Sequence, residues 1–266
     1  MKPVPAQRNR VRIREVVFAV SMGALAAGGA ALTLAALEDG PSTPAIAGPN
    51  KLSYQVAPFD QISTTGPQEV VITYGDAISV RAEGSPQALA QLEAVVEDGR
   101  LTIGPRKGFN WGNWGMLQSG KFYVTVPRLK GIAVAGSGDV RIDRIEGESF
   151  EGKVGGSGEM AIGALKVDEA DFTVAGSGNL VVAGAARETH VTIAGSGEVR
   201  AGSLRSETAS ISIGGSGEVA LTVDDEAQVS ITGSGDVDIS GPGRCSVTRM
   251  GSGNVRCTGG GGDEEE

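Results

Sequence analysis

A short motif, Ala-Gly-Ser-Gly-Asp-Val at residues 135–140, constrains the fold more than any other feature, because versions of it return six more times. Successive copies are 20, 20, 19, 20, 18 and 18 residues apart. A short and steady period is typical of a solenoid, in which each repeat is one turn of a coil and buries its apolar side only against its neighbours. The motif therefore predicts a stacked architecture. The later copies start at Gly156, Gly176, Gly195, Gly215, Gly233 and Gly251.

Apolar and polar residues alternate on both sides of each copy, which is typical of strands with one buried face. Counted from the first glycine, apolar residues recur two before, four after, six after and, more loosely, nine after. The first two rows are Val134, Val154, Val174, Ile193, Ile213 and Ile231, then Val140, Met160, Leu180, Val199, Val219, Val237 and Val255. The other two are Ile142, Ile162, Val182, Ala201, Leu221, Ile239 and Cys257, then Ile145, Leu165, Ala185 and Leu204. We expect these rows to form the core.

The glycines of the motif stand between two such strands, where glycine permits a positive φ and a tight corner. We therefore predict an all-β fold, a single-stranded, right-handed parallel β-helix of about seven turns, each marked by a Gly-Ser-Gly corner. The expected corner glycines are Gly136, Gly138, Gly156, Gly158, Gly176, Gly178, Gly195, Gly197, Gly215, Gly217, Gly233, Gly235, Gly251 and Gly253.

Residues 52–131, which we call the prelude, precede the repeat region at residues 132–258. Strands are predicted at 69–74 and 78–82, and Ser85-Pro86 predicts the start of a short helix with Leu89 and Leu92 on one face. Asp98-Gly99 predicts a type I′ turn in a hairpin. A strand at 121–127 leads toward the first repeat.

This order of elements resembles the head GIN domain family, described as auto-transporter adhesin heads. The resemblance runs from Phe59 and Ile62 through the Asp98-Gly99 hairpin and residues 124–129 into Gly-Ser-Gly, and covers residues 52 to about 255. The repeated Gly-Ser-Gly followed by Asp, Glu or Asn is its most specific part. The resemblance implies a β-solenoid domain, at 52–258, exported to the bacterial envelope.

The N-terminal segment predicts export. Residues 1–15 are basic, residues 16–37 carry no charge, and residues 38–51 form a Pro-rich linker. The uncharged run is long enough to span a bilayer, so a retained anchor is favoured, but Ala45-Ile46-Ala47 matches a signal-peptide cleavage site. In both interpretations the N-terminus stays in the cytoplasm and the body is periplasmic or membrane-anchored outside it. An uncleaved segment would make the membrane a partner.

Charge and cysteine content narrow the function further. From residue 16 onward 18 basic residues stand against 31 acidic ones, so nucleic-acid binding is not expected. Cys245 and Cys257 lie at inward positions of the last turn, and in an oxidising compartment we expect a disulfide that closes the open end of the coil; two separately buried thiols are the alternative. Residues 259–266, rich in glycine and acid, are expected to be disordered.

Two features are candidate binding sites. A row of oxygen-bearing residues directly follows the corners and forms either a solvated turn edge, which we favour, or a Ca²⁺ ladder. Its members are Asp139, Glu159, Asn179, Glu198, Glu218, Asp236 and Asn254. The loop 104–120 holds Phe109, Trp111 and Trp114, which either stack on sugar rings or a partner protein, or latch over the coil.

No catalytic or cofactor-binding residue is expected. The corner serines lack the G-x-S-x-G spacing, and the glycines match neither phosphate-binding pattern. We predict a non-enzymatic, exported envelope β-solenoid with a structural or adhesin-like surface. The alternatives are a polysaccharide-active enzyme, for which Asp143, Arg144, Glu146 and Glu148 are the local charged cluster, and a scaffold that associates with itself.

Overall fold

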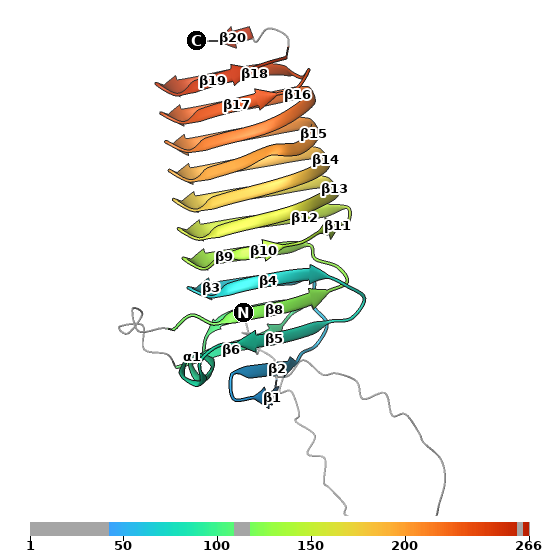
Figure 1. Ribbon diagram of the computed structural model, residues 1–266. Coiled ribbons are helices and arrows are strands. Elements are labelled where there is room, and N and C mark those ends of the chain that lie inside the picture. Colours follow the sequence, from blue (N-terminus) through green and yellow to red (C-terminus); the bar gives the residue numbers. More distant parts are fainter. Residues whose placement is uncertain (1–42, 109–117, 260–262, 266) are drawn as a thin grey trace, which may run out of the picture. The chain divides into compact units, whose positions relative to one another are not determined.

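The computed structural model describes residues 43–108, 118–259 and 263–265. Its strands belong to one hydrogen-bonded sheet that coils back on itself, as predicted (Figure 1). From the N-terminal side, these are β1 (Thr43–Gly48), β2 (Lys51–Gln55), β3 (Gln61–Gly66), β4 (Glu69–Tyr74), β5 (Ser79–Glu83), α1 (Pro86–Gln91), β6 (Leu92–Glu97), β7 (Arg100–Pro105), β8 (Lys121–Val126), β9 (Gly131–Gly136) and β10 (Val140–Ile142). The rest are β11 (Ile145–Glu146), β12 (Ser149–Gly156), β13 (Glu159–Gly176), β14 (Asn179–Gly195), β15 (Glu198–Gly215), β16 (Glu218–Gly233), β17 (Asp236–Ser240), β18 (Arg244–Gly251), β19 (Asn254–Cys257) and β20 (Asp263–Glu265).

Each turn of the repeat region leaves a Gly-Ser-Gly corner, reaches a wide bend and returns to the next corner, and neighbouring turns pair in parallel. We call the strand segments that follow a corner the outgoing side, and those that precede the next corner the return side. In β13 to β16 one long strand supplies both sides, and Figure 1 shows its ribbon curving through the bend. The two sides face each other across the core.

The corners are held by backbone hydrogen bonds from turn to turn. The N–H of Ser216 donates to the carbonyl oxygen of Gly195 at 2.9 Å, and the same bond recurs between the other successive corners of the repeat region. Gly215 has φ of +130°, and a Cβ atom at this position would overlap the carbonyl oxygen of Gly195. Glycine is therefore required both by the backbone angle and by the space between turns.

The predicted core is confirmed for the rows two before, four after and six after the corner, which are buried between the two sides except at the last turn. For the row nine residues after the corner, the prediction was wrong at Ala185, which is exposed, while Ala186 is buried. The cause is that this turn has 19 residues, one fewer than the turns on either side of it. Gly184 has φ of +135° and pairs with Leu165 below and Leu204 above. The register shifts next to it in the pairing of β14 with β13 and again in the pairing of β14 with β15.

Bulky and small residues alternate within the core. Phe150 and Phe172 come from neighbouring turns of the return side, and their ring centroids lie 6.4 Å apart. Gly152 lies below Phe172, where an added Cβ would come within 3.0 Å of the ring. The absence of a side chain at Gly152 thus makes room for the phenyl ring, which is fully buried.

Seven Gly-Ser-Gly corners bound six complete turns, one fewer than the seven turns predicted by counting motifs. The stack of corners is nevertheless longer than the repeat region. Gly66, with φ of +117°, pairs with Gly136, so β3 and β4 form a turn beneath β9 and β10. Pro67 and Gln68 stand there in place of Ser and Gly, and the sequence pattern did not reveal this corner.

The prelude forms the base of the coil, and its order in space differs from its order in the chain. The turn made by β7 and β8 lies beneath β3 and β4, although it comes later in the sequence. β8 pairs with β4 on one edge and, antiparallel, with β5 on the other. The chain then passes from β8 to β9, so that β3 and β4 are enclosed between later strands.

Antiparallel strands and a helix close the base. On the outgoing side β5 pairs with β2 and β2 with β1, and on the return side β6 and β7 form the predicted hairpin. Its turn residues Asp98 and Gly99 both have positive φ, as a type I′ turn requires. Ser85 caps α1 by accepting the N–H of Ala88 at 3.0 Å. Leu92 was expected on this helix, but it begins β6 and is buried there.

Aromatic packing completes the base. The rings of Tyr54 and Phe122 are stacked with centroids 6.2 Å apart. Burial raises the pKa of the Tyr54 hydroxyl above its usual value. Aromatic rings therefore pack together in the interior of the base, as Phe150 and Phe172 do in the repeat region.

Several expected boundaries differ from the structure. β1 lies within the predicted linker 38–51, and the Ala45–Ala47 sequence is part of it. Asp263–Glu265, expected to be disordered, pair with β18 as strand β20. The segments 1–15 and 16–37 lie outside the described residues. Within the part of the chain that is described, no helix has the length and apolar character needed to cross a bilayer.

The last turn departs from the pattern of the others. Cys245 of β18 and Cys257 of β19 are joined in a disulfide across the core, with their Cα atoms 6.6 Å apart. Arg249 replaces the buried Val or Ile of earlier turns, and its side chain donates to the carbonyl oxygen of Gly253 at 3.1 Å. The disulfide thus lies where the other turns have apolar side chains on both sides.

Candidate functional site

The corner edge presents the serines and the acidic row to solvent. Every corner serine is exposed, whereas the second glycine of each corner is buried. In the acidic row, Asp139 accepts the backbone N–H of Glu159 at 3.2 Å, and Asp236 accepts that of Asn254 at 3.1 Å. These carboxylates therefore bond one turn to the next. Such a role fits a solvated edge, and the arrangement gives no separate support for a Ca²⁺ ladder.

Glu198, in the middle of this row, has a different partner. Its carboxylate forms two hydrogen bonds with the guanidinium of Arg200 on the same strand, and these bonds raise the pKa of Arg200. The Arg200 side chain is exposed and that of Glu198 is half-buried, so the pair is still screened by solvent and contributes little to stability. The row is thus chemically mixed.

The tryptophan-bearing loop connects β7 to β8. Phe109, Trp111 and Trp114 lie outside the described residues. β7 ends at Pro105 and β8 begins at Lys121, directly beneath the Gly66 corner. The described strands on either side of this loop therefore end and begin at the corner edge.

The charged cluster considered for catalysis is occupied by structural contacts. The carboxylate of Asp143 accepts the backbone N–H groups of Tyr74 and Arg144, at 2.9 and 2.6 Å. The guanidinium of Arg144 lies over the Tyr74 ring, 5.0 Å from its centroid, and 3.8 Å from Glu146. These contacts shape the bend after β10, and they engage the Asp143 carboxylate with two backbone N–H groups.

The outer face of the return side carries a continuous row of hydroxyl groups, which we call the hydroxyl row. Its members are paired in register across β13, β14, β15, β16 and β18, three residues before each corner. They are exposed or half-buried, and successive members lie about 4.8 Å apart because that is the strand spacing. The row consists of Thr173, Thr192, Ser212, Ser230 and Thr248.

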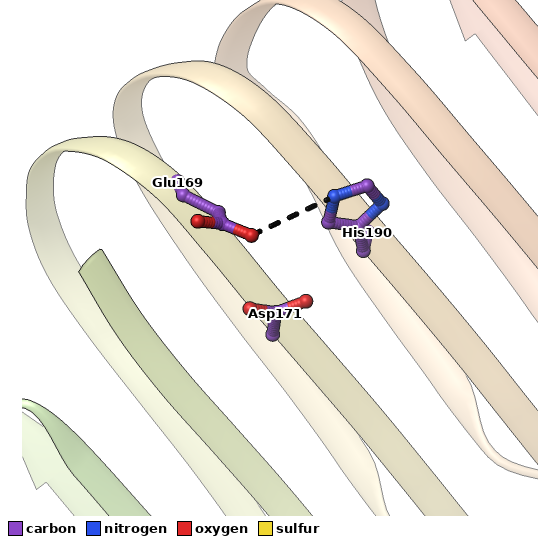
Figure 2. Close-up of side chains that lie close together, drawn as sticks. All are labelled: Glu169, Asp171 and His190. Carbon is purple, nitrogen blue, oxygen red and sulfur yellow. Dashed lines mark ion pairs between the residues drawn. The ribbon is translucent and has the colours of Figure 1, made fainter.

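Beside the hydroxyl row lies a cluster that includes the only histidine of the chain. Glu169 and Asp171 of β13 pair in register with Glu188 and His190 of β14, and all four side chains point outward. The Nε2 atom of His190 is 3.3 Å from Glu188 Oε1 and 3.9 Å from Glu169 Oε1. Figure 2 shows the imidazole and the carboxylates of Glu169 and Asp171 lying close together across the two strands.

The residue spacing in the sequence contains a signal for this cluster. Asp171 and His190 are 19 residues apart, as are Glu169 and Glu188, and 19 is the length of that turn. Residues one turn apart become neighbours in a solenoid. The repeat length therefore predicts that these side chains lie side by side on adjacent turns.

Comparison with known proteins agrees with the architecture. Similar solved structures include a putative adhesin from Bacteroides fragilis, with a TM-score of 0.70 and 22% identity, covering 77% of this chain and 94% of that one. A putative lipid binding protein from Parabacteroides distasonis has a TM-score of 0.61 and 23% identity, covering 79% and 97%. A putative adhesin from Parabacteroides merdae has a TM-score of 0.61 and 18% identity, covering 77% and 94%. At these identities the likeness establishes the fold.

No curated protein matches the chain significantly. A family model matches residues 58–243, from just before β3 to the segment that precedes β18. This span includes the Gly66 corner and six of the seven Gly-Ser-Gly corners, and it ends before the disulfide-bonded turn. The chain therefore belongs to the family described as "putative auto-transporter adhesin, head GIN domain".

Proposed function

We propose that this protein is a non-enzymatic, exported cell-envelope protein that binds an extended partner through the outer face of its return side. The hydroxyl row is the observation that carries the proposal. Five hydroxyl side chains stand in register on adjacent strands, and each can donate and accept hydrogen bonds. The partner class is an envelope glycan or another polymer with regularly spaced polar groups.

A row of equivalent hydroxyl groups can bind one polymer more tightly than a single hydroxyl can. A single exposed hydroxyl contributes only about 0.5–1.5 kcal/mol through one hydrogen bond. Several such contacts made along one polymer act together, because each later contact forms at a high effective concentration. The small residues next to the row, among them Ala175, Ala194 and Gly214, leave the hydroxyls accessible from that side.

The family and the neighbours support an adhesin-like role. The family description and two of the similar structures carry the word adhesin, and none of these names denotes a catalyst. The enzyme alternative has less support, because Asp143 serves the backbone of a bend. The self-associating scaffold also has less, because β20 already pairs with the last return strand, β18.

The test compares two groups of hydroxyls in the full-length protein. The first variant carries Thr173→Val, Thr192→Val, Ser212→Ala and Ser230→Ala in the hydroxyl row. The matched control carries Ser157→Ala, Ser177→Ala, Ser196→Ala and Ser216→Ala at the corners. Beads coated with each protein are applied to an array of bacterial and host glycans and to whole-envelope polysaccharide.

We expect the hydroxyl-row variant to lose at least about tenfold in binding, since four lost hydrogen bonds are worth several times 0.5–1.5 kcal/mol. The corner variant should bind within about twofold of the unmodified protein. Equal binding by all three proteins, or a loss confined to the corner variant, would remove the hydroxyl row as the binding surface. Circular dichroism and thermal unfolding of both variants check that the coil is intact.

A further inference from the structure

We infer that Glu169, Asp171 and His190 form a binding site for a divalent first-row transition metal such as Zn²⁺. The ligand atoms of the three side chains, one oxygen from each carboxylate and one imidazole nitrogen, all lie within 4.8 Å of one another. They come from two adjacent strands in register, with Asp171 directly beside His190 and Glu169 two residues before Asp171 on the same face (Figure 2). Backbone pairing therefore places the ligands before any metal binds.

The distances suit closure around a metal ion. Zinc binds imidazole nitrogen and carboxylate oxygen at about 2.0–2.2 Å, so ligand atoms around one ion lie roughly 3–3.5 Å apart. The Nε2 atom of His190 is already 3.9 Å from Glu169 Oε1. Because the three side chains are exposed or half-buried, small rotations about their own side-chain bonds can close the remaining gap without moving the strands.

The charge balance favours a cation. Glu188 adds a third carboxylate, 3.3 Å from the imidazole. Among the described residues, His190 is the sole side chain that pairs with any of these three carboxylates within 4.0 Å. Lys153 pairs with Glu151, the register neighbour of Asp171, and Arg187 pairs with Asp168 at 3.7 Å. Three carboxylates and one imidazole thus share one small area.

The donor set selects the class of metal. An imidazole nitrogen with carboxylates suits zinc and its first-row neighbours, whereas Ca²⁺ and Mg²⁺ prefer oxygen donors alone. The acidic row on the corner edge has only oxygen donors, and Asp139 and Asp236 bond to backbone there. The His190 cluster differs in having a nitrogen donor.

The single histidine makes the site directly observable. Full-length protein purified without a histidine tag and labelled with ¹⁵N-histidine gives one imidazole, and so one pair of ring nitrogen signals. We expect titration with ZnCl₂ near neutral pH to shift the Nε2 signal to saturation, and the same concentration of CaCl₂ to leave it in place. Isothermal titration calorimetry gives the affinity.

Two substitutions separate the site from general surface charge. Asp171→Asn removes one ligand charge and should weaken Zn²⁺ binding at least about tenfold. Asp238→Asn is the matched control, because Asp238 is an exposed carboxylate on the outgoing side, 3.7 Å from Arg256, and it should leave the affinity within about twofold. The inference is overturned if saturating Zn²⁺ leaves the imidazole signal unmoved, if Asp171→Asn binds as well as the control, or if Ca²⁺ displaces Zn²⁺ at equal concentration. These readouts do not depend on the proposed glycan binding.

Discussion

The base of the coil and the repeat region build the same corner from different sequences. In the repeats the third corner residue is glycine, because a Cβ at Gly158 would overlap the carbonyl oxygen of Gly138 below. At the base Gln68 takes that place, and no corner glycine stacks beneath Gly66. The comparison shows that the positive φ of the first residue defines the corner, whereas the third glycine is required only where another corner lies below.

The two ends of the coil are also closed in different ways. At the base, antiparallel strands, α1 and the stacked rings of Tyr54 and Phe122 cover the interior. At the other end the disulfide between Cys245 and Cys257 joins the two sides, and β20 pairs with the return strand. Packed strands, a helix and aromatic rings thus close one end, whereas a disulfide and a short added strand close the other.

The largest expected effect separates the two glycines at the end of β15. Gly215→Ala places a Cβ against the carbonyl oxygen of Gly195 at a φ of +130°, so we expect a loss of about 4 kcal/mol or more. Gly214→Ala is the control, because its nearest neighbour would be the oxygen of Ile193 at 3.8 Å, and it should cost under about 1 kcal/mol. Urea unfolding followed by circular dichroism measures both; similar losses would mean that the corner does not carry the strain described.

The disulfide should give the next largest effect. Replacing Cys245 and Cys257 together by serine removes a cross-link over 12 residues, which stabilises a fold by about 3 kcal/mol in the loop-entropy description. Because the bond lies in the last turn, hydrogen exchange should rise in β18 and β19 and stay unchanged in β3 and β4. An equal rise at the base would show that the two ends are not independent.

The Gly66 corner sharpens the comparison between base and repeats. A Cβ at Gly66 would meet the Gln68 side chain, whose Oε1 atom would be 2.5 Å away, and a side chain can move where a carbonyl oxygen cannot. Gly66→Ala therefore retains the strain of a φ of +117° without the backbone overlap, and we expect a loss of about 1–3 kcal/mol. A loss as large as that of Gly215→Ala would indicate that the base corner is as tightly confined as the others.

The smallest effect concerns the acidic row. Asp236→Ala removes one of two acceptors of the N–H of Asn254, which also donates to the carbonyl oxygen of Gly235 at 3.2 Å, so we expect a loss of only about 0.5 kcal/mol. Glu218→Ala in the same row is the control, because the N–H of the next row member, Asp236, makes the equivalent backbone bond to Gly217 and, among the described contacts, none to the Glu218 carboxylate. Thermal unfolding should rank Asp236→Ala below Glu218→Ala, and the opposite order would remove the structural role of this carboxylate.

Much of the repeat region was predictable because each turn repeats the same local physics. The period-two rows identified the buried positions, and the glycine spacing identified the corners. The exception at Ala185 arose because the 19-residue turn is one residue shorter than the turns on either side of it, and the slip at Gly184 shows only in the pairing of that turn with its neighbours.

The base was predictable only in part. The Asp98-Gly99 hairpin and the start of α1 follow from local turn and cap chemistry. The insertion of β3 and β4 between β8 and the repeats depends on pairing between residues about 70 positions apart, such as Gly66 and Gly136, and no local pattern encodes it. The His190 cluster likewise depends on register between turns, although there the repeat length supplied the needed information.

The central claim is that the prelude and the repeats form one stack of corners, with Gly66 directly beneath Gly136. Paired cysteines test it, since a disulfide forms only where Cα atoms lie within about 7 Å. Thr65 and Ala135 are register partners on adjacent strands, whereas Ala175 lies two turns beyond Ala135, roughly 10 Å further along the stack. We predict that Thr65→Cys with Ala135→Cys forms an intramolecular disulfide, detected by peptide mass mapping, and that Thr65→Cys with Ala175→Cys does not. Cross-linking of the second pair but not the first would contradict the stack.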